Sequence, residues 1–189
     1  RIIINAAGNF GDLVEAIARP SPFTITPRRG QFVVFDKPAS KLVNAIILPV
    51  PTERTKGVVL FRTAFGNLVI GPTAEDVEER DVAATDSETL HRLARRAMEM
   101  VPALSGIGIN AIYAGLRPAS EHKDYVIEAL GERNWITVGG IRSTGLTASL
   151  GIAQHVCRLY TEHFGVLPET PEPVWTPVPN LTEERPRPY

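Results

Sequence analysis

Cysteine and net charge are both scarce in this chain of 189 residues. The single Cys157 excludes an intramolecular disulfide, and within an apolar helical stretch it is typical of a small core residue in a reducing compartment. The formal net charge of −1 provides no basic field for nucleic acid. We therefore predict a cytoplasmic protein without nucleic-acid partners, and peripheral attachment to the inner face of a membrane is the alternative location.

Long apolar runs and several catalytic motifs are also missing. No run approaches the roughly 18 apolar residues of a spanning helix, and no signal peptide opens the chain. The four histidines have no metal-ligand spacing, so we predict no metal site. No G-x-S-x-G elbow supports hydrolase chemistry, and no G-x-G-x-x-G phosphate-binding fingerprint occurs in the sequence.

The first residues, RIIIN, are apolar enough to predict a buried strand. Such a strand usually lies between other parallel strands, and nothing ahead of it in this sequence supplies them. Because the chain also lacks an initiator Met, we expect it to be a segment of a longer protein.

Turn residues divide the rest of the chain into short apolar segments with the periods of strands and helices. In the first helix, Leu13, Val14 and Ile17 are spaced to form a buried face, and Thr85 with Glu88 forms a capping box for a later helix that ends at Pro102. Strands are predicted at 1–5, 23–37 (two strands around a turn at 27–30), 42–50, 58–62, 68–71, 107–118, 125–130 and 135–138, and further helices at 11–19 and 144–163.

The order of these elements predicts a fold that is partly α/β and partly α+β. Short connections in the middle favour an antiparallel sheet with one helix. Each end alone is too small for a core, so we expect the two ends to pack together and the middle to form a second lobe. The predicted segments are 1–20, 21–112, 113–167 and a tail or linker at 168–189 that is rich in Pro and Glu.

The most informative motif is GGIRSTGLTAS at residues 139–149, which joins an apolar strand to a long helix. A helix N-terminus presents unpaired N–H groups and partial positive charge, which suit an anion or an electron-rich carbonyl. Gly140 and Gly145 leave room for a flat ligand near the backbone, whereas Ser143, Thr144 and Thr147 can cap the helix or donate to a ligand.

A capped buried helix is the structural alternative for this motif, and it leaves Arg142 unexplained. A guanidinium at the base of a glycine-rich turn calls for an anionic partner. YAGLRP places a second arginine, Arg117, at the end of an apolar strand, where it either reaches solvent or anchors a carboxylate or phosphate. INAAG, at residues 4–8, ends a strand in small residues that would let a ligand lie against the backbone.

Three further side chains have open roles. Arg28 and Arg29 of PRRGQ either form a solvated turn or reach the active site from the central sheet. His122 follows GLRP and is the best placed candidate for a general base, although an exposed loop histidine is the alternative.

NAAG, TPRRGQ, GNLVIGPTAED, YAGLRP and GGIRSTGLTAS, in this order, resemble the FAD-dependent oxidoreductases of the D-amino-acid oxidase superfamily. Within that superfamily the chain is most similar to the glycerol-3-phosphate dehydrogenase branch, particularly the anaerobic type, over residues 1–167. The resemblance implies that 1–20 and 113–167 are pieces of a Rossmann-like FAD-binding domain and that 21–112 is the substrate cap.

The resemblance also implies a reaction, in which a hydride leaves a substrate C–H bond for FAD. Arg117 would hold the anionic group of a small substrate, and Arg142 is a second catalytic candidate. Ala7 and Gly8 would lie near the ribityl-diphosphate of FAD. The residues at the start of the last helix would lie by the pyrimidine edge of the flavin. The implied cofactor-binding residues are Ala7, Gly8, Ser143, Thr144, Gly145, Leu146 and Thr147.

The chain departs from this family in one respect, because the Gly-rich diphosphate fingerprint expected ahead of INAAG is absent. We therefore expect a partner in the form of a missing N-terminal FAD-binding portion, and an isolated chain that is inactive. The tail resembles a linker to an iron–sulfur domain, which makes that domain or another electron acceptor a further partner. Two alternatives remain, a 2-hydroxy-acid or amino-acid oxidase or dehydrogenase and a non-catalytic domain completed by another chain.

Overall fold

The computed structural model describes residues 1–50, 57–166 and 176–177, which fold into two compact units. Among these residues, the first unit comprises 1–31, 73–85 and 114–166, and the second comprises 32–50, 57–72 and 86–113. Strands β2 (Ile25–Phe35) and β6 (Ile109–Ser120) each contribute to both units.

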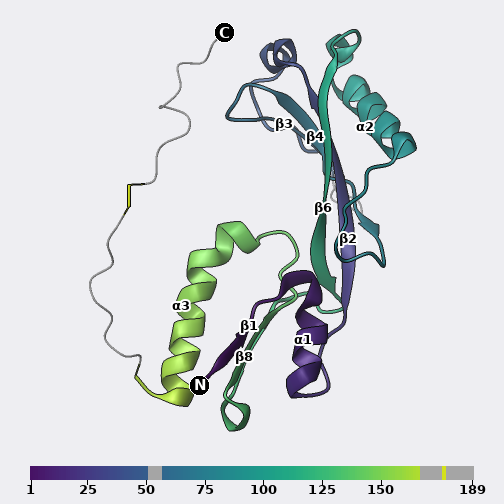
Figure 1. Cartoon of the computed structure of the whole chain (residues 1–189). Coiled ribbons are helices and arrows are strands. Elements are labelled where there is room, and N and C mark those ends of the chain that lie inside the picture. The colour runs from purple at the N-terminus through teal and green to yellow at the C-terminus, as the bar shows by residue number, and fades with distance from the viewer. Residues whose placement is uncertain (51–56, 167–175, 178–189) are drawn as a thin grey trace. The chain divides into compact units, whose positions relative to one another are not determined.

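A three-stranded sheet of order β1-β8-β7 organises the first unit. Strand β1 (Ile3–Asn5) pairs in parallel with β8 (Trp135–Gly139), with Asn5 opposite Thr137, and β8 pairs in antiparallel register with β7 (Val126–Leu130). Figure 1 shows β1 and β8 between helices α1 (Gly11–Ala18) and α3 (Gly145–Phe164). The first unit also contains β5 (Glu75–Asp76) and single 3-10 turns at Gly8–Phe10 and Gly131–Arg133.

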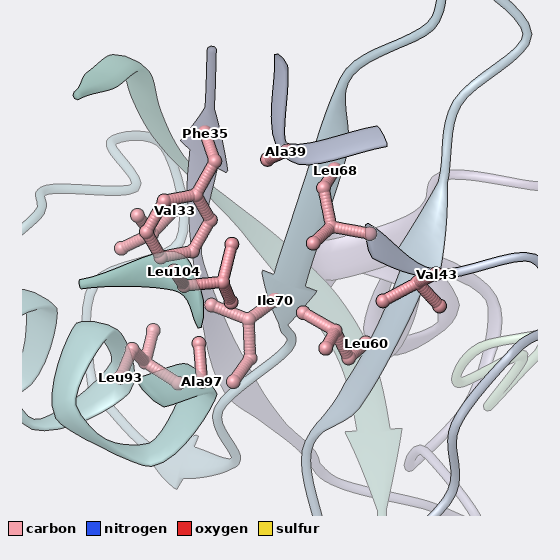
Figure 2. Packing of buried hydrophobic residues seen from close by; sticks show 10 residues of the cluster. All are labelled: Val33, Phe35, Ala39, Val43, Leu60, Leu68, Ile70, Leu93, Ala97 and Leu104. Carbon is pink, nitrogen blue, oxygen red and sulfur yellow. The ribbon is translucent and has the colours of Figure 1, made fainter. Parts of the chain in front are cut away.

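The second unit packs helix α2 (Ser87–Met100) on an antiparallel sheet. Strands β3 (Val59–Arg62) and β4 (Leu68–Gly71) form a hairpin, and β4 also pairs with the end of β2. The core side chains point toward one another between these elements and the 3-10 turns Lys37–Leu42 and Pro102–Leu104 (Figure 2). They are Val33, Phe35, Ala39, Val43, Leu60, Leu68, Ile70, Leu93, Ala97 and Leu104.

The predicted fold class is confirmed, because an antiparallel sheet with a helix accompanies a parallel strand pair with helices. The 58–62 and 68–71 hairpin, the antiparallel strands at 125–130 and 135–138, and the last long helix are also confirmed. These elements have strong apolar periodicity with glycine or charged residues at their ends, so local pattern and tertiary packing agree.

Two strand predictions are wrong. The segment 23–37 contains the single strand β2 (Ile25–Phe35), because Arg28 and Arg29, within the predicted turn, pair with Asp76 and Glu75 of β5 and keep the backbone extended. Residues 42–50 form no regular strand, and their described pairing is one isolated bridge between Ile47 and Leu60. Val43 is buried, but Leu42, Ile46, Leu48 and Val50 are exposed, so this apolar run marked neither a buried strand nor a ladder.

The first helix and the first strand differ from prediction in what they bury. Helix α1 buries Gly11, Asp12 and Glu15, whereas Leu13 and Ile17 are 54% and 80% exposed. Strand β1 also leaves Ile3 and Ile4 about half exposed, since β8 is its sole pairing partner among the described residues.

The cap of α2 is also corrected. Asp86, and not Thr85, is the N-cap residue, and its carboxylate accepts a hydrogen bond of 2.8 Å from the backbone N–H of Thr89. Asp and Ser or Thr compete closely for this position, so the sequence alone placed the cap one residue early.

The compact units do not follow the predicted segment boundaries residue by residue. Residues 21–31 and 73–85, predicted in the cap, fold with the first unit, together with most of the two terminal segments. The assignment to an FAD-binding domain and a substrate cap stays a prediction. The predicted tail at 168–189 lies outside the described residues, apart from 176–177.

We expect Gly139→Ala to destabilise the chain by about 1–3 kcal/mol, because a Cβ atom there would lie 2.5 Å from Cζ of the buried Phe23. Urea denaturation followed by circular dichroism measures the change. Gly151→Ala is the matched control, since no heavy atom lies within 4 Å of its Cβ position in α3 and alanine favours a helix. Equal stability of the two variants would contradict the tight packing at Gly139.

Candidate functional site

Two loops meet at the carboxyl edge of the parallel β1–β8 pair. Since Asn5 lies opposite Thr137, the residues after Asn5 and those after Gly139 leave the sheet at the same edge. In open α/β sheets this edge is where ligands bind. The structure therefore brings two of the three predicted motifs, INAAG and GGIRSTGLTAS, to a single edge.

The loop after β1 is open around Gly8. Gly8 has φ of +57°, and no described atom lies within 4 Å of the position of a Cβ. The N–H of Ala7 donates to Oδ1 of Asn5 at 3.3 Å, which fixes the start of the loop to the buried end of β1. The backbone at Ala7 and Gly8 is thus shaped for close approach by another group.

The loop after β8 ends at the N-terminus of α3. Thr144 is the N-cap residue, but its side chain makes no capping bond and is instead hydrogen-bonded to the hydroxyl of Tyr125. The N–H groups of Gly145, Leu146 and Thr147 have no acceptor among the described residues. Ser143, Thr144, Leu146 and Thr147 are all exposed. This helix end therefore offers free donors and partial positive charge.

Arg117 lies at the end of β6 and is held by main-chain carbonyl groups. Its Nε and Nη2 donate to the oxygens of Arg28 and Arg29 at 3.3 Å, and Nη2 also donates to that of Thr73 at 2.6 Å. No described carboxylate forms an ion pair with Arg117, and its Nη1 has no hydrogen-bond partner there. Burial lowers the pKa of Arg117, and the charge of Arg28 lowers it further.

Arg142 approaches the same region from the loop after β8. Its Nη2 donates to the main-chain oxygens of Ser120, at 2.6 Å, and of His122. Two buried polar atoms there have no described partner, Nε of Arg142 and Oγ of Ser120. The hydroxyl of Ser120 also lies 3.1 Å from the position of a Cβ on Gly140, whose φ is +68°.

A polar cavity of about 450 Å³ lies beside these arginines. Arg28 lines it and binds Asp76 with two hydrogen bonds of 2.6 and 3.1 Å. The hydrogen bond from Arg28 lowers the pKa of Asp76, and the charges of Arg117 and Arg142 lower it further. The cavity lining contains one guanidinium group, of Arg28, and two carboxylates, of Asp76 and Glu121. The lining residues are Thr24, Thr26, Arg28, Asp76, Ala119, Ser120 and Glu121.

The other candidates lie differently. Arg29 pairs with Glu75 at 2.5 Å and donates to the main-chain oxygen of Ala84, but unlike Arg28 it is not among the residues that line the cavity. Nε2 of the exposed His122 is 2.9 Å from the carbonyl oxygen of Pro22, which can only accept. Nε2 therefore carries the hydrogen, and Nδ1 is the nitrogen that could take a proton.

Sequence reasoning missed Asp76 and Ser120, which line the cavity, because neither stands in a pattern with chemical meaning. The signal for Asp76 was its place in GPTAED, a short segment that becomes a strand only by pairing with Arg28. No His, Cys, Asp or Glu group suited to a metal ion occurs in the described part of the chain.

Comparison with known proteins gives the context for this arrangement. The profile of a family described as FAD dependent oxidoreductase matches residues 1–159. A glycerol 3-phosphate dehydrogenase of Caloramator mitchellensis is 35% identical over 160 residues, covering 82% of this chain and 33% of that protein. A glycerol 3-phosphate oxidase of Mycoplasma genitalium is 33% identical over 160 residues, covering 83% of this chain and 42% of that protein.

Among solved structures, the dithionite-reduced L-alpha-glycerophosphate oxidase of Mycoplasma pneumoniae, with FAD bound, has a TM-score of 0.73 and 30% identity. The alignment covers 84% of this chain and 42% of that protein. A glycine oxidase of Bacillus cereus has a TM-score of 0.70 at 21% identity, which shows a shared fold. The chain spans about a third to two fifths of the length of the curated relatives.

Proposed function

Because the chain belongs to the family of FAD-dependent oxidoreductases, we propose that it is the substrate-cap and C-terminal flavin-contacting part of one such enzyme. The proposed reaction oxidises a small anionic alcohol, glycerol 3-phosphate or a close analogue. The observation that carries this substrate class is that main-chain oxygens hold the guanidinium groups of Arg117 and Arg142, neither of which has a carboxylate partner among the described residues. A guanidinium group without a carboxylate partner favours an anionic ligand.

The residues at the carboxyl edge of β1 and β8 fit FAD in two respects. The open backbone around Gly8 would accept the ribityl-diphosphate, with Ala7 beside it. The free N–H groups of Gly145, Leu146 and Thr147 would donate to the pyrimidine edge, with Ser143 and Thr144 at the rim. When bound, FAD supplies the hydride acceptor for the substrate's C–H bond.

Arg117 and Arg142 would bind the substrate's anionic group. Nη1 of Arg117 is the donor left over when three carbonyl contacts orient the rest of its guanidinium. Nε of Arg142 is buried without a described partner, so a ligand oxygen would satisfy it. The side chains would thereby orient the substrate for oxidation, and Nδ1 of His122 is the candidate acceptor for the hydroxyl proton.

The exposed apolar surface of the first unit supports a missing N-terminal FAD-binding portion as partner. Helix α3 has no buried residue, and Leu146 and Leu150 are 91% and 85% exposed. Together with the exposed Ile3 and Ile4, they would be covered by the portion that carries the absent phosphate-binding fingerprint. An iron–sulfur domain or another electron acceptor stays a prediction.

The location also stays a prediction. No helix in the described part of the chain is long and apolar enough to cross a membrane. Attachment to the inner face of a membrane and a cytoplasmic location remain the two expected alternatives.

The proposal is tested on the complete protein. We expect it to bind FAD stoichiometrically, with flavin absorbance, and to reduce the flavin with glycerol 3-phosphate rather than with lactate or glycine. Reduction of the flavin by lactate or glycine would instead support the alternative of a 2-hydroxy-acid or amino-acid oxidase or dehydrogenase, in which Arg117 binds the carboxylate of the substrate. Activity restored only by mixing this chain with a separate dinucleotide-binding chain would support a two-chain assembly, and absence of FAD binding would refute the proposal.

A further inference from the structure

Arg80 and Asp12 form an ion pair in the first unit and are not among the residues that line the cavity. Nη1 and Nη2 of Arg80 bind Oδ1 and Oδ2 of Asp12 at 2.6 and 3.0 Å. The Asp12 side chain is 8% exposed and that of Arg80 is 21% exposed. Burial by itself raises the pKa of Asp12, but the hydrogen bonds from Arg80 and from the N–H of Ile25 outweigh it. The pair is therefore a fixed structural contact.

The same guanidinium reaches the loop after β1. Nη1 of Arg80 donates to the main-chain oxygen of Asn9 at 2.6 Å, and Nδ2 of Asn9 donates back to the main-chain oxygen of Arg80 at 3.3 Å. Asn9 directly follows Gly8, whose surroundings are open. Arg80 thus ties the loop predicted to approach the cofactor to a segment about 70 residues later in the chain.

A second set of hydrogen bonds joins the same ion pair to β2. Nη2 of Arg80 donates to the oxygen of Ile25 at 3.0 Å, while Oδ2 of Asp12 accepts from the N–H of Ile25 at 2.9 Å. The ion pair, the loop after β1 and the start of β2 therefore belong to one hydrogen-bond network. Because Asp12 neutralises Arg80, this arginine is suited to holding the loop and not to binding a phosphate itself.

From this network we infer that Arg80 is a positioning residue for FAD, which fixes the loop of Ala7, Gly8 and Asn9 in the conformation that admits the diphosphate. The inference rests on the proposed function for the identity of the cofactor. Its consequence is that cofactor retention depends on a side chain that makes no contact with the cofactor.

The test compares Arg80→Met, Arg80→Lys and wild type in the complete protein. FAD affinity is measured by fluorescence titration, and loop mobility by hydrogen–deuterium exchange of peptides covering residues 5–12. Arg80→Met is expected to weaken FAD binding by at least about tenfold and to speed exchange in the loop, since it leaves buried partners unsatisfied. Arg80→Lys keeps the positive charge but loses the two-pronged geometry of the guanidinium group. Its FAD affinity and loop exchange should therefore lie between those of wild type and Arg80→Met.

Arg96→Met is the matched control, because Arg96 pairs with Glu99 on the exposed face of α2 in the second unit. It should leave FAD affinity and loop exchange unchanged. At saturating FAD, the kcat of Arg80→Met should return to within about twofold of wild type, which a substrate-binding role would not allow.

Unchanged FAD affinity in Arg80→Met would overturn the inference, as would faster exchange spread evenly over the first unit with a matching fall in melting temperature. If Arg80→Met does not fold, wild-type affinity in Arg80→Lys would overturn it, and intermediate affinity with loop-specific exchange would support it. A wild-type protein that binds no FAD would instead refute the proposed function, and with it the cofactor role of Arg80.

Discussion

Arg117→Met in the complete protein is expected to lower kcat/KM for the anionic substrate by at least about tenfold. A hydrogen bond to a charged group contributes about 1.5–3 kcal/mol, which corresponds to about 10–150-fold in kcat/KM. The structure leaves Nη1 of Arg117 available for that bond while its other donors bind main-chain carbonyls. Steady-state kinetics with glycerol 3-phosphate, and competition by inorganic phosphate, measure the loss.

Because Arg117 also supports the main chain of Arg28, Arg29 and Thr73, a structural effect must be separated from lost binding. Arg117→Lys keeps the charge and should recover part of the activity. Arg96→Met, which changes an exposed arginine of α2, should leave kcat/KM unchanged. Wild-type kinetics in Arg117→Met, in a protein with unchanged melting temperature, would remove Arg117 from the site.

Glu15→Ala is expected to have the largest effect on folding stability, a loss of about 3–5 kcal/mol in the free energy of unfolding. The carboxylate of Glu15 is fully buried and accepts hydrogen bonds from four groups. They are Nδ2 of Asn5 at 2.9 Å, Nε of Arg19 at 2.8 Å, Nε1 of Trp135 at 3.0 Å and Oγ1 of Thr137 at 2.8 Å. Its removal leaves Nε of Arg19, Nε1 of Trp135 and Oγ1 of Thr137 without this acceptor, while Nδ2 of Asn5 keeps its bond to the main-chain oxygen of Gly11.

Urea denaturation of the complete protein measures this loss, and Glu99→Ala, an exposed carboxylate on α2, is the control expected to stay within about 0.5 kcal/mol. A loss in Glu15→Ala no greater than that of the control would mean that the four donors find other partners.

The same carboxylate predicts a dependence of stability on acid. Burial alone raises the pKa of Glu15, but the hydrogen bonds from Asn5, Thr137, Trp135 and Arg19 outweigh burial and hold the pKa below its ordinary value. A lowered pKa in the folded state means that the stabilisation is complete above the ordinary pKa of about 4.3 and is lost as pH falls through the lower, folded-state value. The difference in unfolding free energy between wild type and Glu15→Gln should therefore shrink below about pH 4.

The sequence could predict the elements whose local pattern agrees with their surroundings. The hairpin of β3 and β4, the strands β7 and β8 and the helix α3 follow from period, glycine turns and termini. It could also predict the two loops that meet at one sheet edge, because small residues after an apolar strand have a meaning independent of the fold. The roles of Arg117 and Arg142 at the site stay predictions.

Local pattern failed where a polar side chain was satisfied by a distant partner. Leu13 and Ile17 were expected on the buried face of α1, yet Asp12 and Glu15 are the side chains that are buried there. The reason is that Arg80 donates to Asp12, and Trp135 and Thr137 donate to Glu15. Hydrophobic periodicity assigns a side chain to water or to the core by its own polarity and contains no information about a donor 120 residues away.

The amino-acid sequence by itself determined the fold class, the order of the family's motifs and the absence of a phosphate-binding fingerprint, since each is written in consecutive residues. The tertiary structure decided that residues 25–35 form one strand, that Arg28 pairs with Asp76, and that main-chain oxygens hold Arg117 and Arg142. Those facts depend on which segments pair across the sheet, and strand pairing is a choice between distant residues whose energies no local stretch contains.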